Sequence, residues 1–305
     1  MLAPIIVFAF NRPEALKNTI QSLLQNEEAK DSVLYVFVDG ARPNKPEEGE
    51  KVRAVQEYVK EIKGFKNIHY TFSQSNKGLA PSIIAGVTEI INQYNKVIVV
   101  EDDLYLSKSF LSYMNQMLDS FQNNKSIFQV SGFGVKIKKP LSYQADVYYN
   151  IRAQCWSWGT WKDRWDTIDW EVNDYEDLLK NKKKQRAFNK AGSDMFGMLK
   201  RYKNGAISSW YIRFCYSMFK QHKLSVCPIR SLVINEGFGD DATHCHNYNR
   251  YKTDFDLIGK RTYIVPDLPP QINPRIQKQV LFYWSIPYRI YGKIMTYLSN
   301  MRFKY

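Results

Sequence analysis

The amino-acid sequence predicts an α/β domain built on a mostly parallel β-sheet flanked by helices. Short apolar runs alternate with helical patterns through the first third of the 305 residues. This alternation is the chain order of parallel strands joined by helical crossovers. Polar clusters follow several of the apolar runs directly, and in such sheets the carboxyl ends of the strands form the ligand crevice. The chain is long enough for one large domain with a substantial core.

Four strands are expected in this first region, each a short apolar run bounded by turn or helix signals. They are Pro4–Phe10, Val33–Val38, Ile68–Phe72 and Val97–Val100. The helices between them are marked by apolar residues at helical spacing. The first, which Pro13 opens, carries Leu16, Ile20, Leu23 and Leu24; the second carries Val52, Val55, Val59 and Ile62; the third carries Ile84, Val87 and Ile91. Proline suits the first turn of a helix because its missing N–H would be unpaired there.

The pattern changes in the second half. The expected elements there are a helix over Phe110–Phe121, a strand over Ile127–Ser131, a helix over Ile207–Phe219 and a short strand over Ser231–Ile234. Residues 143–170 are rich in Tyr and Trp, and residues 180–190 are basic and polar. Residues 267–270 are expected to link the domain to a C-terminal helical tail.

Composition narrows the class of protein. The formal net charge of +13 favours phosphates, nucleic acid or anionic lipid as partners. The charge is spread along the chain without a nucleic-acid recognition motif, so we expect no nucleic-acid partner. The four cysteines form no CxxC pair and are interpreted as reduced thiols of a cytosolic protein. No signal peptide or membrane-spanning run is recognised, so any membrane contact is expected to be peripheral.

Three consecutive acids, Glu101, Asp102 and Asp103, follow the fourth apolar run directly. Such acids after a buried strand are costly unless a cation neutralises them, and Mg²⁺ or Mn²⁺ prefers oxygen ligands. We expect Asp103 to bind the metal, with Asp102 and Glu101 facing its waters or a bound ribose. The alternative is a solvated acidic turn that caps the following helix, but the position in a β/α repeat favours the metal site.

Three segments, PIIVFAFNRP (4–13), YVFVDG (35–40) and KVIVVEDDLYLSKSF (96–110), together resemble GT-A glycosyltransferases of the family-2 kind. The sequence is especially similar to the N-acetylglucosaminyltransferase I branch and to bacterial sugar transferases known as haemolysin-like, over residues 3–250. The resemblance implies a Rossmann-like GT-A sheet, a UDP-sugar donor, Mn²⁺ or Mg²⁺ as cofactor, and transfer with inversion to a glycan.

The resemblance also implies roles for residues near the strand ends. Arg12 would contact the donor phosphate or base, Asp39 the uracil or its ribose, and Lys77 lies in a loop that approaches the donor. Glu101 and Asp102 would sit beside the sugar and ribose, while Asp103 would ligate Mn²⁺.

The segment Gln154–Trp165 matches a stretch that lines the sugar and acceptor site in the resembling proteins. Trp156, Trp158 and Trp161 are therefore candidates to stack on sugar faces. Packing in the core is the alternative for each of these rings.

The general base is where the sequence departs from the resembling proteins, which have an Asp soon after a Trp. Here Tyr211 follows Trp210, and a tyrosine with a pKa near 10 is a poor base at neutral pH. Three explanations stay open: the base lies elsewhere, the segments do not correspond, or the protein is weakened. The last makes a non-catalytic sugar-nucleotide-binding relative the alternative function.

Asn235–His246 (NEGFGDDATHCH) offers the best replacement base. Asp241, or its neighbour Asp240, is the candidate base, and His244 is a candidate to touch the diphosphate or complete the metal shell. A zinc site that includes His246 is another reading, although the spacing fits no common structural zinc pattern. The remaining alternative is a polar loop with capping acids.

The tail after Asp267 contains no acidic residue. It carries basic, aromatic and apolar residues at helical spacing, and Pro287 is expected to break it. Two readings are left open for residues 271–305. One is peripheral attachment to the inner face of the plasma membrane, where a lipid-linked acceptor would be met. The other is ordinary packing on the domain or on a second subunit.

The expected organisation is a GT-A domain over residues 1–265 and a basic aromatic tail over 266–305. Within the domain, residues 1–105 would bind the nucleotide sugar and residues 106–265 the acceptor. The expected enzyme is a cytoplasmic hexosyl- or N-acetylhexosaminyltransferase that acts on a bacterial surface glycan or a lipid-linked oligosaccharide. A sugar-phosphate nucleotidyltransferase is disfavoured, because Asn11-Arg12-Pro13 lacks the glycine-rich phosphate loop after the first strand.

Overall fold

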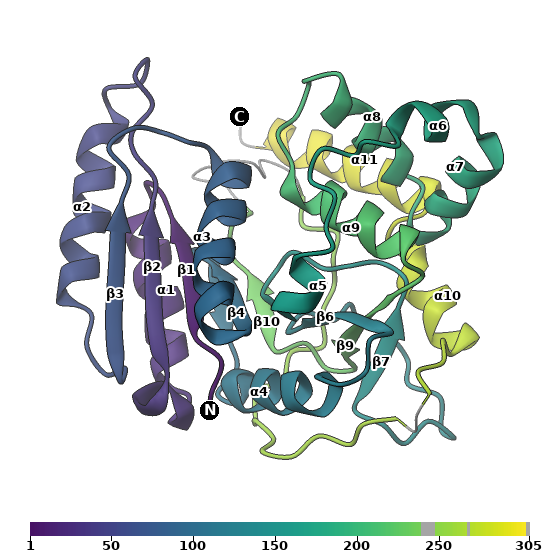
Figure 1. Ribbon diagram of the computed structural model, residues 1–305, viewed down its shortest axis with the longest axis horizontal. Helices are drawn as coiled ribbons and strands as arrows, with labels where there is room; N and C mark the ends of the chain where they lie inside the picture. Colours follow the sequence, from purple (N-terminus) through teal and green to yellow (C-terminus); the bar gives the residue numbers. More distant parts are fainter. Residues whose placement is uncertain (239–247, 267–268, 303–305) are drawn as a thin grey trace.

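Four parallel strands form one half of the central sheet in this computed structural model (Figure 1). They are β1 (Ile5–Ala9), β2 (Val33–Val38), β3 (Asn67–Phe72) and β4 (Lys96–Glu101). Their spatial order is β3-β2-β1-β4, so the first strand lies inside the sheet. The structure describes residues 1–238, 248–266 and 269–302, without the side chains of 300–302.

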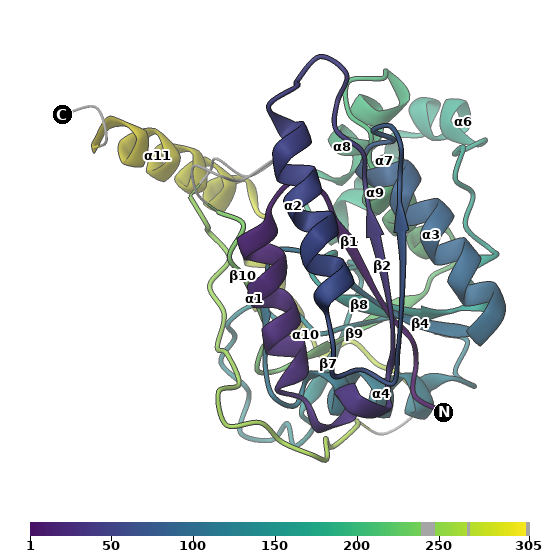
Figure 2. The same ribbon diagram turned by 90° about the vertical axis from the view of Figure 1, so that its left-hand side faces the viewer.

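Helices cover both faces of this parallel half, since side chains alternate between the faces along each strand. Ile5 and Val7 of β1 pack in one cluster with α1 (Pro13–Leu24) and α2 (Glu48–Glu61). Ile6 and Phe8 pack in the other cluster with α3 (Leu79–Tyr94). Figure 2 shows α1 and α2 on one side of the sheet and α3 on the other. A short 3₁₀ helix (Glu27–Asp31) connects α1 to β2.

The other half of the sheet is mixed. It contains β8 (Trp158–Trp161), β6 (Ile127–Ser131), β9 (Leu224–Pro228) and β7 (Val147–Asn150). β8 runs antiparallel between β4 and β6, β9 is parallel to β6, and β7 closes the edge in antiparallel register. A separate two-stranded antiparallel sheet pairs β5 (Leu104–Leu106) with β10 (Val233–Asn235). This pairing places the start of the NEGFGDDATHCH segment beside the acidic triplet.

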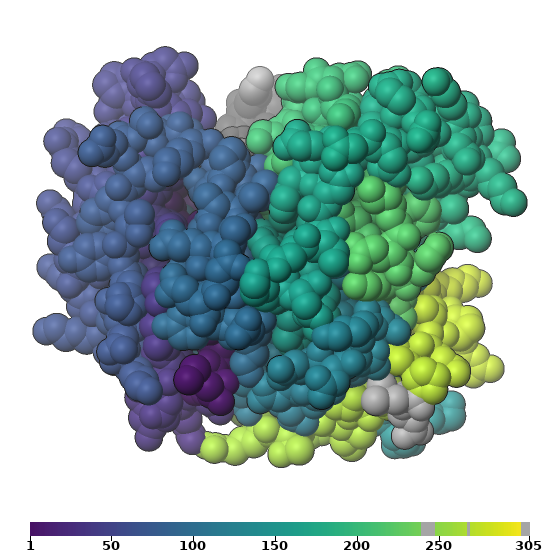
Figure 3. Space-filling model, viewed as in Figure 1, coloured from purple at the N-terminus to yellow at the C-terminus, as the bar shows by residue number. Residues whose placement is uncertain are grey.

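The remaining helices surround the mixed half. They are α4 (Phe110–Phe121), α5 (Lys162–Trp165), α6 (Tyr175–Lys180), α7 (Lys182–Phe188), a 3₁₀ turn (Asn189–Ala191), α8 (Met195–Lys203) and α9 (Trp210–Lys220). Two C-terminal helices follow, α10 (Pro274–Phe282) and α11 (Ile286–Arg302). In the space-filling view the N-terminal third of the chain occupies one side of the molecule and most of the later residues occupy the other, with a yellow-green segment running along the bottom (Figure 3).

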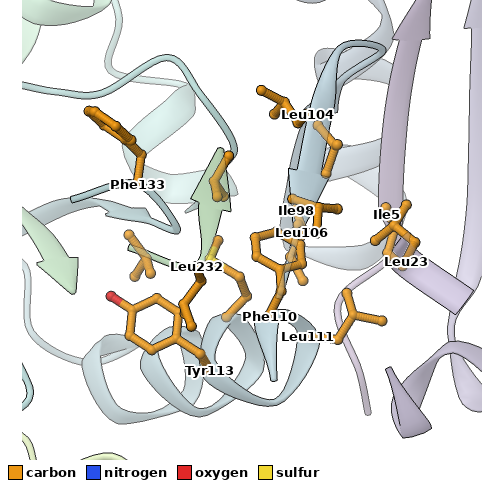
Figure 4. Packing of buried hydrophobic residues seen from close by; sticks show 14 of the residues in the cluster. Ile5, Leu23, Ile98, Leu104, Leu106, Phe110, Leu111, Tyr113, Phe133 and Leu232 are labelled. Carbon is orange, nitrogen blue, oxygen red and sulfur yellow. The ribbon is translucent and has the colours of Figure 1, made fainter. Parts of the chain in front are cut away.

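The two halves share a hydrophobic cluster beneath the small sheet. Leu104 and Leu106 of β5 pack against Phe110 of α4 and against Ile98 of β4 (Figure 4). All of these side chains are buried. Burial of that many apolar groups holds the segment after the acidic triplet firmly against the sheet.

The predicted fold class, a mostly parallel sheet flanked by helices with a helical tail, is confirmed. The predicted bounds of the second strand, of α4 and of β6 match the structure. The helix expected from Ile207 begins at Trp210, where the Ser209 side chain accepts a hydrogen bond from the N–H of Ile212 and caps it. The sequence analysis missed β7 and β8, which lie in the Tyr- and Trp-rich segment, and it also missed β5, β9 and most of α6–α8.

Among the described helices, none is both long enough and apolar enough to cross a bilayer. Cys215 and Cys227 are free thiols.

Trp158 is expected to be a main contributor to stability. It is 1% exposed, and its ring stacks on Trp210 with centroids 4.9 Å apart. Trp158→Ala should lower the free energy of unfolding by about 3–5 kcal/mol, because it leaves a large cavity. Urea denaturation measures this. Leu141→Ala, at a side chain that is 99% exposed, should change stability little, and a comparable loss in both variants would contradict the prediction.

Candidate functional site

The carboxyl ends of β2, β1 and β4 lie side by side and carry the polar residues that the sequence singled out. Ala9 is in register with Val38, and Phe8 with Glu101. Asp39, Arg12 and the acidic triplet therefore gather at one edge of the sheet. This edge is the crevice expected to bind ligands in open α/β sheets.

Asp39, directly after β2, holds the loop that follows β3. Its Oδ1 accepts hydrogen bonds from the N–H of Gly40 at 3.0 Å and of Lys77 at 2.9 Å. Its Oδ2 accepts one from the N–H of Gly78 at 2.9 Å. The side chain of Lys77 remains exposed. The structure thus brings Asp39 and the backbone of Lys77 together at this edge of the sheet.

Gly40 lets the two loops meet. A Cβ at this position would lie 2.5 Å from the backbone carbonyl carbon of Ser75. Any side chain here would push the loops apart and break the hydrogen bonds to Asp39. The close contact between the two loops therefore requires Asp39 and Gly40 at these positions, independently of any ligand.

Arg12 neutralises the acidic triplet. Its Nη1 donates to Asp103 Oδ2 at 2.9 Å, and its Nη2 is paired with Asp102 Oδ1. The N–H of Phe10 also donates to Asp102 Oδ2 at 3.3 Å. The sequence analysis expected Arg12 to face a donor, and it did not anticipate that the guanidinium would bridge two of the acids.

The carboxyl groups beside Arg12 are strongly buried. Burial raises the pKa of Asp102 to about 6, although the ion pair with Arg12 opposes this shift. Burial and the nearby charges of Asp103 and Asp102 raise the pKa of Glu101 well above its usual range. A cation bound at this edge would offset the repulsion between these carboxylates and would favour their ionised forms.

The donor atoms present fit a hard divalent cation. Asp103 Oδ1 is buried without a hydrogen-bond partner among the described residues. The backbone closes over the same carboxylate at Gly237, where a Cβ would lie 1.9 Å from Asp103 Oδ2. Within the described ranges, however, no three His, Cys, Asp or Glu residues form a metal-binding group on their own. Magnesium often uses only one or two carboxylates and completes its shell with phosphates and water.

The candidate base and the candidate histidine lie outside the described residues. These are Asp240, Asp241 and His244, and His246 lies there too. The segment leading into them is anchored at the triplet, because the N–H of Glu236 donates to the carbonyl oxygen of Asp103 at 2.9 Å. The roles proposed for these residues stay predictions.

Tyr211 belongs to the interior. Its hydroxyl donates to the carbonyl oxygen of Ala153 at 2.8 Å and accepts from Arg152 Nε at 2.9 Å. Burial raises its pKa well above 10. A phenol in this environment keeps its proton, so Tyr211 does not replace the missing aspartate.

Two of the three tryptophans proposed to stack on sugars lie in the core, so that expectation is wrong for them. Trp158 packs against Trp210, and Trp161 donates its indole N–H to the carbonyl oxygen of Leu118 at 3.1 Å. Trp156 is only half-buried, and its ring contacts Phe238 with centroids 5.6 Å apart. Only Trp156 is placed at the rim of the site.

Sequence reasoning missed Arg152 and Gly237. Arg152 is buried, forms two hydrogen bonds to Asp194, at 2.8 and 2.9 Å, and lies over the ring of Trp284. It thereby ties β7, α8 and the C-terminal helices together. No local sequence pattern predicts an ion pair between residues that are 42 positions apart. The sharp NEGFG turn was visible, but its contact with Asp103 was not.

Fold and site together define a nucleotide-sugar-transferase-type α/β domain with an acidic cluster at the carboxyl end of its fourth strand. The chain belongs to glycosyl transferase family 2, whose model matches residues 5–198 of 305. Family membership identifies it as a glycosyltransferase.

Solved structures show distant likeness. A mannosyltransferase, PcManGT, from Pyrobaculum calidifontis in complex with GDP-Man and Mn²⁺ is 10% identical, with 73% of this chain and 70% of that chain covered and a TM-score of 0.38. A UDP-glucose pyrophosphorylase complexed with UDP-glucose is 13% identical over 75% and 90%, with a TM-score of 0.38. TarS from S. aureus is 15% identical, with a TM-score of 0.32; the match covers 48% of this chain but only 24% of TarS. Such low scores do not bear on what this chain binds.

Asp39→Asn should loosen the loop after β3. The substitution replaces one carboxylate oxygen by an NH₂ group, which is a donor and would face a backbone N–H donor. At least one of the N–H groups of Lys77 and Gly78 therefore loses its acceptor. We expect a loss of about 1–3 kcal/mol in the free energy of unfolding, measured by urea denaturation. Asp31→Asn, at an exposed acid, is the matched control. An Asp39→Asn variant as stable as this control would show that the three bonds do not hold the loop.

Proposed function

We propose that the protein transfers a sugar from a UDP-sugar, with inversion, in a reaction that depends on Mn²⁺ or Mg²⁺. One observation carries the proposal: the buried Oδ1 of Asp103 has no partner among the described residues, and it lies at the carboxyl edge of the sheet of a glycosyl transferase family 2 domain. Arg12 already balances part of the acidic charge there. A divalent ion and a diphosphate would complete the balance.

Each residue at the edge then has a role. Asp103 would hold the cation, and Glu101 and Asp102 would face its waters and the sugar or ribose. Arg12 would turn from the acids toward the diphosphate, and Asp39 with the Lys77 loop would shape the nucleoside site. A bound cation offsets the diphosphate charge and stabilises the leaving group.

The acceptor hydroxyl needs a general base. We assign this role to Asp241, with Asp240 as the neighbouring candidate, and we assign His244 to the metal shell or the diphosphate. The segment that carries them starts at Glu236 and Gly237, which contact Asp103. It therefore begins where the acceptor must approach the donor.

We further propose a division of labour along the chain. Residues 1–105 would bind the nucleotide sugar, residues 106–265 the acceptor, and residues 266–305 would form a separate tail. The acceptor would be a bacterial surface glycan or a lipid-linked oligosaccharide, and the transferred sugar a hexose or N-acetylhexosamine. By resemblance we place the chain near the N-acetylglucosaminyltransferase I branch, in the cytoplasm at the inner face of the plasma membrane.

Tyr211 motivates a second candidate, a relative that binds sugar nucleotides without transferring the sugar. The buried hydroxyl of Tyr211 excludes it as a base. This candidate predicts donor binding with neither transfer nor donor hydrolysis.

Donor binding should depend on both metal and Asp103. A UDP-sugar with Mn²⁺ at about a hundred times its dissociation constant should stabilise the protein by about 2.7 kcal/mol, seen as a rise in melting temperature. Asp103→Asn should abolish the Mn²⁺-dependent part of this rise. Glu50→Gln, at an exposed acid in α2, should leave it intact. An unchanged shift in Asp103→Asn would remove the basis of the proposal.

Variants of Asp241 and Tyr211 test which of the two residues acts as the general base. Asp241→Asn should lower kcat by about 10²–10⁴-fold while the donor-induced thermal shift persists. Tyr211→Phe should keep kcat within a few-fold, because the phenol does not exchange its proton in the reaction. Radiolabelled sugar transfer to acceptor glycans measures both. Donor binding without any turnover in the wild type would favour the non-catalytic candidate.

A further inference from the structure

Helix α11 turns its apolar side chains away from the protein. Five large apolar residues are between 46% and 66% exposed and follow one another at helical spacing. They are Ile286, Ile290, Ile294, Tyr297 and Leu298. We call this set the outer stripe. In Figure 2, α11 projects from the body of the molecule.

The opposite side of α11, which carries Gly292, Thr296 and the Tyr288 ring, packs on the domain. Gly292 is buried and lies against Arg250, where an added Cβ would be 3.1 Å from the Arg250 side chain. The N–H of Tyr248 donates to Thr296 Oγ1 at 3.0 Å. The Tyr288 hydroxyl donates to the carbonyl oxygen of Arg250 at 2.9 Å.

This arrangement reverses the usual amphipathic surface helix, which buries its apolar stripe and exposes its polar side. Half-exposed isoleucines four residues apart therefore need an apolar partner, which the described part of the chain does not supply. The preceding helix, α10, exposes one large apolar side chain, Phe282, and does not form a comparable stripe. Ile276, Val280 and Trp284, in and just after α10, are buried against the body, which narrows the candidate surface from residues 271–305 to α11.

The charge of the tail selects the kind of partner. No acidic residue follows Asp267. Six basic residues do, namely Arg275, Lys278, Arg289, Lys293, Arg302 and Lys304. Lys293 is exposed next to the outer stripe. An apolar stripe flanked by cations alone matches the interface of an anionic bilayer. A second copy of the chain would bring like charges together without an acid to offset them.

The helix is also tied to the candidate site. Tyr248 and Arg250, on which α11 packs, follow the segment that starts at Glu236 and Gly237 beside Asp103. α11 lies at the end of the molecule toward which the strands of the parallel half point (Figures 1 and 2). A surface that holds α11 therefore lies on the same side as the carboxyl ends of β1 and β4.

We propose that the outer stripe of α11 binds the interface of an anionic membrane, with the helix lying along the surface and Lys293 facing the lipid phosphates. The mouth of the candidate site then opens close to the lipid headgroups. Resting on the proposed function, it follows that the acceptor is carried by a membrane lipid and is not a glycan free in solution.

Vesicle flotation tests the surface with the full chain. We expect binding to phosphatidylcholine vesicles that contain phosphatidylglycerol, weak binding to phosphatidylcholine alone, and loss of binding as salt rises. Ile290→Ser combined with Ile294→Ser should lower the partition constant at least about tenfold. Lys293→Gln should lower it about fivefold.

Leu257→Ser combined with Ile258→Ser is the matched control, because both side chains are exposed, at 74% and 84%, and lie outside α11. This control should bind vesicles as the wild type does. Equal binding by the α11 double variant, or equal loss in the control, would overturn the proposal. So would a dimer in light scattering that only the α11 variant dissociates, because the stripe would then cover a second copy.

The same variants separate this proposal from the proposed function. The α11 double variant should keep the full thermal shift with UDP-sugar and Mn²⁺, since Asp103 and Arg12 are untouched. A lost shift with intact vesicle binding would count against the enzyme assignment alone. If the wild type does not bind vesicles but shows the thermal shift with UDP-sugar and Mn²⁺, only the proposed membrane surface is refuted.

Discussion

The pairing of Arg12 with Asp102 and Asp103 is the interaction on which this site depends. A buried strand ends in three consecutive acids, which would be very costly to bury without a counter-charge. The guanidinium belongs to Arg12, which directly precedes α1, and it reaches from the end of β1 to the end of β4. The parallel sheet makes this reach short, because it sets the ends of both strands beside each other. The pairing of β1 with β4 therefore allows the ion pairs to form, and the ion pairs stabilise the acids at the end of β4.

Sequence alone predicts the parallel half well, because its strands are continuous apolar runs and its helices carry clear apolar stripes. The mixed half is harder. β7 and β8 lie in a Tyr- and Trp-rich segment, where the sequence does not distinguish rings in the core from rings that bind sugars. Both readings were therefore open for Trp158 and Trp161, and the structure places them in the core. Periodicity shows that a residue lies on a face. It does not show which neighbour covers that face.

The same limit applies to the site. Spacing along the chain predicts that Asp39, Arg12 and the triplet share an edge, since that follows from strand order. It does not predict that Arg12 bridges two of the acids or that Gly237 passes over Asp103, because those contacts join segments about 90 and 134 positions apart. The sequence of α11 shows an apolar stripe but does not show whether this stripe faces the domain or the solvent. Only the packing of Gly292 and Thr296 on residues 248–250 decides it.

The ion pairs that Arg12 forms with Asp102 and Asp103 have a consequence for how ligands bind at this edge. Arg12 partly balances the charge of these acids from within the protein. Under the proposed function, a metal ion would bind the Oδ1 of Asp103 that has no partner in the described part of the chain, and its charge would repel the guanidinium that is bound to Oδ2 of the same carboxylate. A nucleotide diphosphate offers the displaced guanidinium a new anion. Cation and nucleotide should therefore help one another to bind, and neither alone would hold the edge as firmly as both together.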